Sequence, residues 1–417
     1  MLSHQMAYGV ARASLLDAGL TLAALAVMLL PAPPLLGLLA ALHVATVVQH
    51  LPAVYNHWFF GGLVSLALLL ASLGAWWRGQ GSWGRAGDLL PAAFAPAARW
   101  SLLLLYFLSG LHKLNADFFD PAVSCASVLY RGLRAGLPVL PDGPVMGPLA
   151  IGITVLLELG LPLLLLVPRT RRIAVVAGIC FHVLMAAAGY PRFSATGLAL
   201  LVLFLPSLPR PGPAFRAAAV AALLAASMLV PAQRDALFVW ATLGLCGGVL
   251  ALCFVPAGDD REGAVSLRPA LPALLGPSLI LFAGLTPYLG LGTDRALSMY
   301  SNLRTEGGRS NHFLIPAGLQ MASFQRDLVA VLGSSAAPLA RLAADRMLIP
   351  WAELRARLTE ATISSGRVSL TYLRNGRRYE VGSAATDSAL ALPVSRLPRK
   401  FIRFRAVEAE GPRRCSV

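Results

Sequence analysis

The feature that most constrains this chain is a succession of long apolar runs between residue 15 and residue 291. Each run is bounded by Pro, Gly, Arg or Trp, and many approach the roughly 17–25 residues that a transmembrane helix needs. Hydrophobic residues make up 57% of the 417 residues and charged residues only 13%, which excludes an ordinary soluble globular protein. We therefore predict an all-α, multi-pass membrane protein with about ten transmembrane helices, whose main partner is the lipid bilayer.

The predicted transmembrane domain covers residues 10–291. The first run ends in Pro31 rather than at a small-residue cleavage site, so it is predicted to be a span and not a cleavable signal peptide. Between the fourth and fifth spans, Asp120-Pro121 indicates the start of a short interfacial helix that ends near Arg134. The predicted spans are 15–30, 34–51, 58–77, 97–115, 145–167, 173–190, 194–206, 215–230, 236–256 and 270–291.

The distribution of arginine predicts the orientation of these spans. Short cytoplasmic loops carry an excess of basic residues, and here the loops after odd-numbered spans hold more arginines than the N-terminus and the other loops. We therefore expect a cell-membrane protein whose C-terminal domain is non-cytoplasmic. The net charge of +15 does not indicate nucleic acid as a partner, because the basic residues do not gather into a patch beside aromatic residues.

The pattern changes after Gly292, and residues 292–417 are predicted to form a small soluble α+β domain. Residues 319–362 are predicted to be helical, with breaks at Ala337-Pro338 and Pro350-Trp351. Residues 367–382 alternate around Asn375-Gly376, which is typical of a β-hairpin, and residues 400–407 are predicted to be a final strand. The five cysteines show no metal-site spacing, so neither a metal nor a disulfide framework is expected.

A stripe of polar and small residues marks the end of the fourth span. Tyr106, Ser109, Gly110 and Lys113 share one helical face by their spacing, and Lys113 is one of only two lysines in the chain. An ammonium near the hydrocarbon boundary is costly, and desolvation favours the neutral form of an amine, so Lys113 is a candidate base. The alternative is that Lys113 reaches the membrane surface or pairs with Asp117.

Other polar residues lie within the apolar runs or at their edges. Asn56 and His57 stand at the start of the third span, Glu158 lies deep in the fifth, and His182 lies in the sixth. Each also has a structural interpretation. His57 is then an ordinary interfacial residue, His182 an interhelical hydrogen-bonding residue, and Glu158 the partner of His182 or of an arginine.

Taken together, these segments resemble one family. Gly110-Leu-His-Lys113-Leu-Asn-Ala-Asp117-Phe resembles the G-x-K-K-L-D-A-D-W segment of vitamin K-dependent γ-glutamyl carboxylases, and Asn56-His57 followed by Gly61-Gly-Leu resembles their Asn-His segment. The run from Phe181-His182 through Phe193 to Leu205-Pro206 is similar to their Phe-His helix pair. The resemblance covers about residues 10–300, the HTTM (horizontally transferred transmembrane) domain, and Ser298 to His312 resembles the junction segment of bacterial HTTM proteins.

The resemblance implies chemistry on a reduced naphthoquinone of the vitamin K or menaquinol type, without a metal. In the family, the second lysine of the pair is the proposed base that deprotonates the hydroquinone, and this role carries over to Lys113. The oxygenated quinone then removes a γ-proton from a peptidyl glutamate, which attacks carbon dioxide. The implied catalytic residues are Lys113, His57 and His182, the implied quinone-binding residues are Asn56, Tyr106 and His112, and the supporting residues are Asp117 and Glu158.

The chain also departs from the family. His112 replaces the first lysine of the pair, Asn115 stands where the family has aspartate, and the large lumenal substrate-recognition domain is missing. A peptide or protein substrate is therefore less expected than quinone chemistry. The alternative is a non-enzymatic HTTM scaffold that binds lipid, or a protein partner through its C-terminal domain. A transporter is disfavoured because no repeat halves or paired interrupted helices are found.

Overall fold

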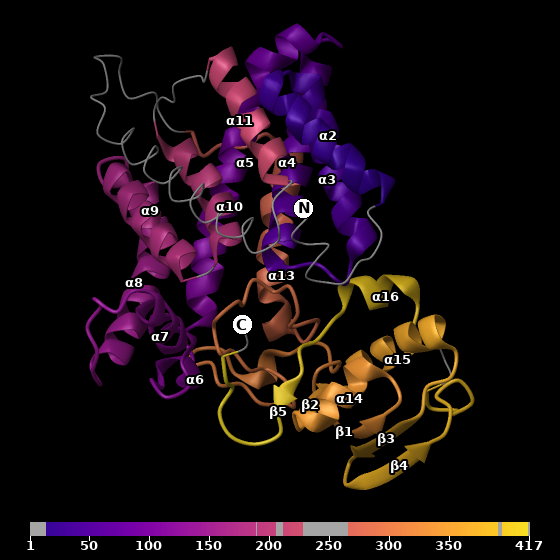
Figure 1. The fold of residues 1–417 in the computed structure, drawn as a ribbon. Helices are drawn as coiled ribbons and strands as arrows, with labels where there is room; N and C mark the ends of the chain where they lie inside the picture. The colour runs from indigo at the N-terminus through magenta and orange to yellow at the C-terminus, as the bar shows by residue number, and fades with distance from the viewer. Residues whose placement is uncertain (1–13, 189, 206–211, 228–265, 391–393, 416–417) are drawn as a thin grey trace. The chain divides into compact units, whose positions relative to one another are not determined.

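The computed structural model describes residues 14–188, 190–205, 212–227, 266–390 and 394–415, and Figure 1 shows the elements that these residues form. The chain divides into two compact units. The first unit comprises residues 1–107, 132–140 and 155–281, and the second comprises residues 108–131, 141–154 and 282–417. The helices α5 (Trp83–His112), α8 (Met146–Leu166) and α13 (Leu275–Leu289) each contribute residues to both units.

Apolar helices make up the first unit. A capping box starts its first described helix, because Ser14 Oγ accepts from Asp17 N while Asp17 Oδ2 accepts from Ser14 N. Small residues such as Ala67, Ala71 and Ala97 are buried where helices meet, which allows close helix packing in a membrane. The remaining helices of this unit are α2 (Leu15–Leu29), α3 (Pro33–His50), α4 (Asn56–Arg78), α9 (Arg171–Ala187), α10 (Pro191–Leu201), η1 (Val202–Phe204), α11 (Pro213–Ser227) and η2 (Leu271–Leu274).

The structure confirms a multi-pass helical membrane architecture. Five helical segments of the described residues are long and apolar enough to cross a bilayer: Pro33–His50, Asn56–Arg78, Trp83–His112, Met146–Leu166 and Leu271–Leu289. Two shorter apolar helical segments are Leu15–Leu29 and Phe193–Phe204. A total of about ten spans is not established, and the predicted span at 236–256 lies outside the described residues.

Two predicted helix starts are wrong. The span predicted at 97–115 corresponds to α5, which begins at Trp83 and contains Pro91 and Pro96. Proline interrupts helical hydrogen bonding, but membrane helices tolerate it where the freed backbone groups find other partners. The interfacial helix predicted from Pro121 is α7 (Cys125–Gly136), because Asp120 Oδ1 accepts from Ala122 N and forms a turn instead of a helix cap.

The second unit contains the predicted α+β domain. Its sheet has the strand order β4-β3-β1-β2-β5, and every neighbouring pair is antiparallel. The sheet and helices enclose a core that includes Val329, Leu354 and Tyr372. The elements are β1 (Leu328–Ser334), α14 (Ala337–Ala344), β2 (Met347–Pro350), α15 (Trp351–Ser365), β3 (Leu370–Arg374), β4 (Arg377–Val381), α16 (Arg396–Phe401) and β5 (Val407–Glu408).

Predictions for this domain are partly confirmed. The hairpin is present as β3 and β4, with Asn375 and Gly376 at φ values of 51° and 75°, as a type I′ turn requires. The predicted helix over residues 319–336 is wrong, because residues 328–334 form the central strand β1. The final strand predicted at 400–407 is also wrong in extent, since α16 continues to Phe401 and β5 is only Val407–Glu408.

A buried carboxylate holds the last part of the chain to α15. Glu353 is almost fully buried and accepts hydrogen bonds from Arg403 Nε at 2.9 Å, Arg403 Nη2 at 2.8 Å and Phe404 N at 3.0 Å. A buried charge is tolerated only when it is paired and hydrogen-bonded in this way. Residues 403–404 are therefore fixed in position, and the chain continues from them through β5 to residues 413–415.

Candidate functional site

Lys113 follows directly after the last residue of α5 and is enclosed within the second unit. It is 2% exposed. Its Nζ donates to Ser109 Oγ at 2.9 Å and lies 3.4 Å from the Ser109 carbonyl oxygen and 3.5 Å from the Met299 carbonyl oxygen. The ring of Phe118 lies 5.8 Å from Nζ. These contacts bury the amine inside the protein.

The backbone around the Met299 carbonyl has an uncommon conformation. Arg295, Leu297, Tyr300 and Asn302 all have φ values between 52° and 57°, in the left-handed region that residues other than glycine rarely adopt. Such strain persists only where the surroundings fix it, and it concentrates at functional sites. Leu297 is fully buried, so packing holds the strained backbone that faces Lys113.

Asn115 joins the end of α5 to the junction segment, residues 298–312. As the N-cap of α6 (Ala116–Phe119), its Oδ1 accepts from Phe118 N at 2.9 Å. Its Nδ2 donates to the carbonyl oxygens of His112 at 2.8 Å and Ser301 at 2.6 Å. An ionised aspartate has no donor for these two carbonyls. The asparagine that distinguishes this chain from the family therefore supplies a bridge that aspartate cannot.

His112 has protein partners for both ring nitrogens. Nε2 lies 3.0 Å from the Ala296 carbonyl oxygen, and Nδ1 lies 2.8 Å from the hydroxyl of Tyr288 on α13. A carbonyl only accepts, so Nε2 donates and Nδ1 accepts from the tyrosine. His112 thus connects α5, α13 and the strained segment. The role of His112 in quinone binding stays a prediction. To bind a quinone, the ring would have to break one of these two hydrogen bonds and form one to the quinone instead.

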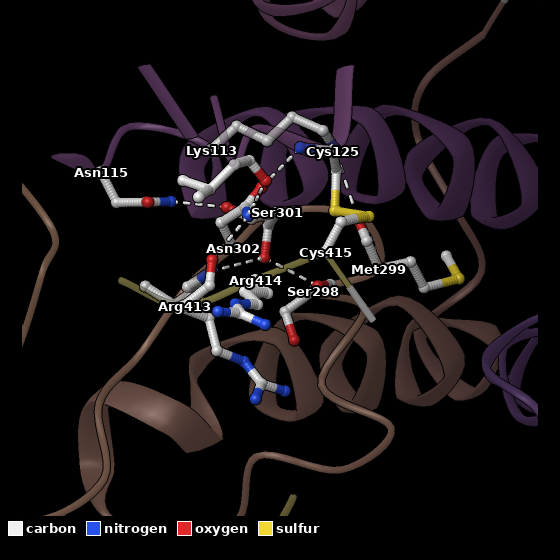
Figure 2. The surroundings of a disulfide bond; sticks show 12 residues. Lys113, Asn115, Cys125, Ser298, Met299, Ser301, Asn302, Arg413, Arg414 and Cys415 are labelled. Atoms are coloured by element: carbon white, nitrogen blue, oxygen red, sulfur yellow. Dashed lines mark hydrogen bonds between the residues drawn. A yellow bond between two sulfur atoms is a disulfide. The ribbon is translucent and has the colours of Figure 1, made fainter. Parts of the chain in front are cut away.

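Residues 413–415 are attached to the segment that follows Lys113. Asp117 Oδ2 accepts from Asn311 Nδ2 and from Arg413 N, both at 2.8 Å. Cys125, the first residue of α7, forms a disulfide with Cys415 (Figure 2). The expectation of no disulfide is therefore wrong, because the two cysteines are separated by 290 residues and no spacing motif links them.

Asn302 forms hydrogen bonds to both chain segments that the disulfide joins. Its Oδ1 accepts from Cys125 N at 2.8 Å, and its Nδ2 donates to the Arg413 carbonyl oxygen at 2.8 Å (Figure 2). Figure 2 shows Asn302 beside Ser301 and close to the disulfide. The junction segment is consequently bound to α5, α7 and residues 413–415 at once.

In the first unit, Tyr106 of α5 and His182 of α9 form a buried pair. Tyr106 Oη and His182 Nε2 lie 2.8 Å apart, and both residues are buried. Among the described residues, His182 Nδ1 has no hydrogen-bond partner. The rings of Phe181 and Phe193 lie 5.5 Å and 6.0 Å from the imidazole. The structure thus brings together Tyr106, which is predicted to bind the quinone, and His182, which is predicted to be catalytic. Nδ1 of His182 is left available for a ligand.

Gly197 of α10 makes room for the His182 ring. A Cβ at this position would overlap both Nε2 and Cε1 of His182 and would lie 3.2 Å from Cδ2. The absence of a side chain is therefore required for the Tyr106–His182 pair. No sequence pattern indicated this requirement, since an isolated glycine in an apolar helix is common in membrane proteins.

The other predicted residues of the first unit lie at the start of α4 and on α8. Asn56 is the first residue of α4, and its buried Oδ1 has no hydrogen-bond partner in the part of the chain that the structure describes. The His57 ring stacks on Tyr55 with centroids 5.5 Å apart, and Glu158 is buried on α8. If Lys113, His57 and His182 are the catalytic residues, as the resemblance implies, they should converge on one cavity. This stays a prediction, because Lys113 belongs to the second unit whereas His57 and His182 belong to the first.

The unused polar atoms fit a ligand that carries oxygen groups. Asn56 Oδ1 can accept a hydrogen bond from a hydroxyl, and His182 Nδ1 can donate to an oxygen or accept from one, depending on its tautomer. Both belong to residues for which the resemblance implies contact with a quinone. Among the described residues, no group of three His, Cys, Asp or Glu side chains is placed to bind a metal ion.

Sequence reasoning missed several residues that complete this region. Tyr288 fixes His112, and Asn311 binds Asp117. His312 donates from Nε2 to the Leu111 carbonyl oxygen, and its Nδ1 accepts from Leu314 N. Burial is the largest influence on His312 and lowers its pKa, which agrees with a neutral ring that both donates and accepts. Asn311 and His312 lie in the junction segment. The resemblance of that segment to bacterial HTTM proteins was the sequence feature that could have indicated these two residues.

Comparison with known families matches residues 37–206 to the model of the HTTM domain. The matched range includes the Asn56-His57 pair, the stripe from Tyr106 to Lys113, and His182. No curated protein and no solved structure matches the chain. The HTTM resemblance is therefore confirmed over this range, which does not include the junction segment.

Proposed function

We propose that this membrane protein, whose residues 37–206 form an HTTM domain of the carboxylase-related family, oxidises a lipid quinol and uses Lys113 as the base. The observation that carries the proposal is the burial of Lys113, which is 2% exposed and hydrogen-bonded to Ser109 Oγ. A lysine serves as a base when its amine is shielded from water. A scaffold has no need of such shielding.

The contacts of Lys113 suit proton transfer. The Ser109 hydroxyl can accept from an ammonium or donate to a neutral amine, so it supports the side chain before and after it takes a proton. The Met299 carbonyl lies on a strained, buried segment and limits where Nζ can sit. Positioning of this kind is what general-base catalysis requires.

The buried pair of Tyr106 and His182 supports the binding of a quinol by the same protein. When bound, a quinol supplies two hydroxyl groups, and its conversion to quinone epoxide would give up four electrons to O2, with one oxygen atom entering the epoxide and the other leaving as water. The unpartnered His182 Nδ1 and Asn56 Oδ1 offer hydrogen bonds to such oxygen groups, while Phe181 and Phe193 offer apolar contact to a ring. Tyr106 orients His182 through Nε2.

The disulfide supports a non-cytoplasmic C-terminal domain. Disulfides persist in oxidising compartments such as the periplasm or its equivalent and are rare in the cytosol. The Cys125–Cys415 bond therefore agrees with the orientation proposed from the arginine distribution. On this orientation, Lys113 and the junction segment face the outer side of the membrane.

A specific observation favours the alternative, a non-enzymatic scaffold. His112 has partners for both ring nitrogens, and Asp117 holds Asn311 and Arg413. These contacts give a structural role to His112 and Asp117, two residues that the resemblance places in the active region. If the whole region is structural, Lys113 serves only to fill and stabilise it, and its chemistry is dispensable.

Replacement of Lys113 tests the proposal. The purified protein in lipid nanodiscs is supplied with a reduced naphthoquinone and oxygen, and quinone epoxide is measured. We expect Lys113→Met and Lys113→Arg each to reduce turnover by about 10²- to 10⁴-fold, as loss of a general base does. Arginine keeps the positive charge but does not lose its proton at any accessible pH.

Lys400→Met is the matched control, because Lys400 is the other lysine of the chain and belongs to α16. It should keep full turnover. Gel filtration and thermal unfolding establish that the Lys113 variants remain folded. Full turnover in Lys113→Arg would contradict the base assignment, and absence of turnover in the wild type under these conditions would favour the scaffold.

A further inference from the structure

Residues 313–324, here called the apolar loop, expose apolar side chains and include one short 3-10 helix, η3 (Ala317–Leu319). The loop contains no charged residue, and Leu314 and Met321 are 69% and 86% exposed. Phe313, Leu319 and Phe324 are exposed as well. An exposed apolar cluster of this kind on a protein surface marks an interaction site. The hydrogen bonds that hold the loop to the ends of α5 and α13 indicate which partner it contacts.

One end of the apolar loop is bound to the end of α5. Phe313 N donates to the Leu114 carbonyl oxygen at 2.9 Å, and the neighbouring His312 Nε2 donates to the Leu111 carbonyl oxygen at 2.9 Å. The rings of Phe313 and Phe119 are in edge contact with centroids 5.5 Å apart. Phe313 therefore lies where the apolar part of α5 stops.

The other end of the loop is bound to the end of α13. Ala322 N donates to the Leu289 carbonyl oxygen at 3.1 Å, and Gln325 Nε2 donates to the Pro287 carbonyl oxygen at 2.9 Å. Gly290, at a φ of 78°, allows this approach, because a Cβ there would overlap the Ala322 carbonyl oxygen. Met321 is thus held next to the last turn of α13.

The two helix ends lie on the same side of the membrane. Leu108 packs against Gly284 and, one turn later, His112 binds Tyr288, so α5 and α13 run parallel. Charged residues follow each apolar helix at once: Lys113 and Asp117 after α5, and Asp294 and Arg295 after α13. The hydrocarbon layer therefore ends at this level, and both ends of the apolar loop are bound there.

We propose that the apolar loop inserts into the interfacial layer of the lipid leaflet that surrounds these two helix ends. Its exposed side chains then contact acyl chains, to a depth of roughly 5–10 Å into the headgroup boundary. The exposed Arg309 and Arg326 flank the loop and favour anionic headgroups. This inference does not rest on quinol chemistry, since a scaffold would use the same anchor.

Nitroxide quenching tests the insertion in the full-length protein. Single cysteines at Leu314→Cys and Met321→Cys carry a nitrobenzoxadiazole label, with Cys180, Cys246 and Cys253 replaced by serine and the Cys125–Cys415 disulfide kept. The matched control is Ile363→Cys on α15, an apolar residue with 70% exposure. The proteins are placed in phosphatidylcholine–phosphatidylglycerol vesicles that contain lipid with a nitroxide near the headgroups.

We expect nitroxide lipid to quench the labels at Leu314→Cys and Met321→Cys several times more strongly than the label at Ile363→Cys. Equal quenching at all three positions would overturn the inference. A water-soluble nitroxide should show the opposite order. Labels in the loop that neither quencher reaches would indicate that a protein partner or a second copy covers it, which also overturns the assignment to lipid. A monodisperse elution profile confirms that each labelled protein is folded.

Discussion

Gly197→Ala adds one methyl group at the point where α10 meets the His182 ring. The added Cβ would overlap Nε2 and Cε1 of the imidazole. Nε2 is the atom that hydrogen-bonds Tyr106 Oη at 2.8 Å. Either α10 must move away from α9, or the ring must rotate and give up Tyr106. Both outcomes disturb the pair through which the quinol is proposed to be bound.

The size of the effect follows from three contributions. Forcing an extra carbon into a packed interior costs about 1–3 kcal/mol. If the ring rotates, Tyr106 Oη and His182 Nε2 lose their partners in a buried site, which costs about 1–3 kcal/mol more. Alanine is better than glycine in a helix interior by up to about 1 kcal/mol. The sum is a destabilisation of about 1–5 kcal/mol if the hydrogen bond is lost and of about 0–2 kcal/mol if it survives.

Thermal unfolding in detergent, followed by loss of monodisperse protein, measures this change. Gly160→Ala on α8 is the control, because among the described residues no atom beyond its own stretch of helix lies within 4 Å of the added Cβ, and it should stabilise the protein by roughly 0.5–1 kcal/mol. The same substitution is thus expected to have opposite signs at the two positions. If Gly197→Ala is as stable as Gly160→Ala and keeps the wild-type quinol affinity, the packing argument for His182 is refuted.

Two further predictions concern the C-terminal part of the chain. Alkaline phosphatase fused after Val417 should be active and a fusion after Arg171 silent, because loops rich in arginine stay cytoplasmic; the reverse pattern would contradict the proposed orientation. Cys415→Ser should destabilise the second unit by roughly 2–4 kcal/mol, since the disulfide restricts the unfolded chain. Reductant should lower the unfolding temperature of the wild type to that of Cys415→Ser, and a wild type unaffected by reductant would show that the bond does not contribute.

The sequence predicted best what depends on local composition. The span predicted at 145–167 agrees with α8, and the one predicted at 58–77 agrees with α4, because the length of an apolar run is itself the signal. The hairpin was equally local, since Asn375-Gly376 adopts positive φ at low cost. The start of α5 was missed because prolines such as Pro91 and Pro96 usually interrupt a helix. Here the surrounding structure allows α5 to continue through both of them.

What the sequence could not predict depends on distant residues. The strand β1 pairs with β2 and with β3, so a stretch that was predicted as helix became the centre of a sheet. In the candidate site, the rarity and spacing of Lys113 indicated it as a candidate base, which stays a prediction. The requirement for Gly197 was not visible, because it exists only once the His182 ring lies against α10.

The attachment of residues 413–415 also sets an order of events during biosynthesis. Cys125 forms its disulfide with Cys415, and Asp117 accepts a hydrogen bond from Arg413 N. The region after Lys113 therefore cannot form all its contacts until these residues, which are made much later, have been synthesised. The 290 residues between the two cysteines need roughly 15–60 s of translation at 5–20 residues per second. The region around Lys113 therefore stays incomplete during that interval, and it is finished only after the C-terminal residues have been made and the disulfide has formed.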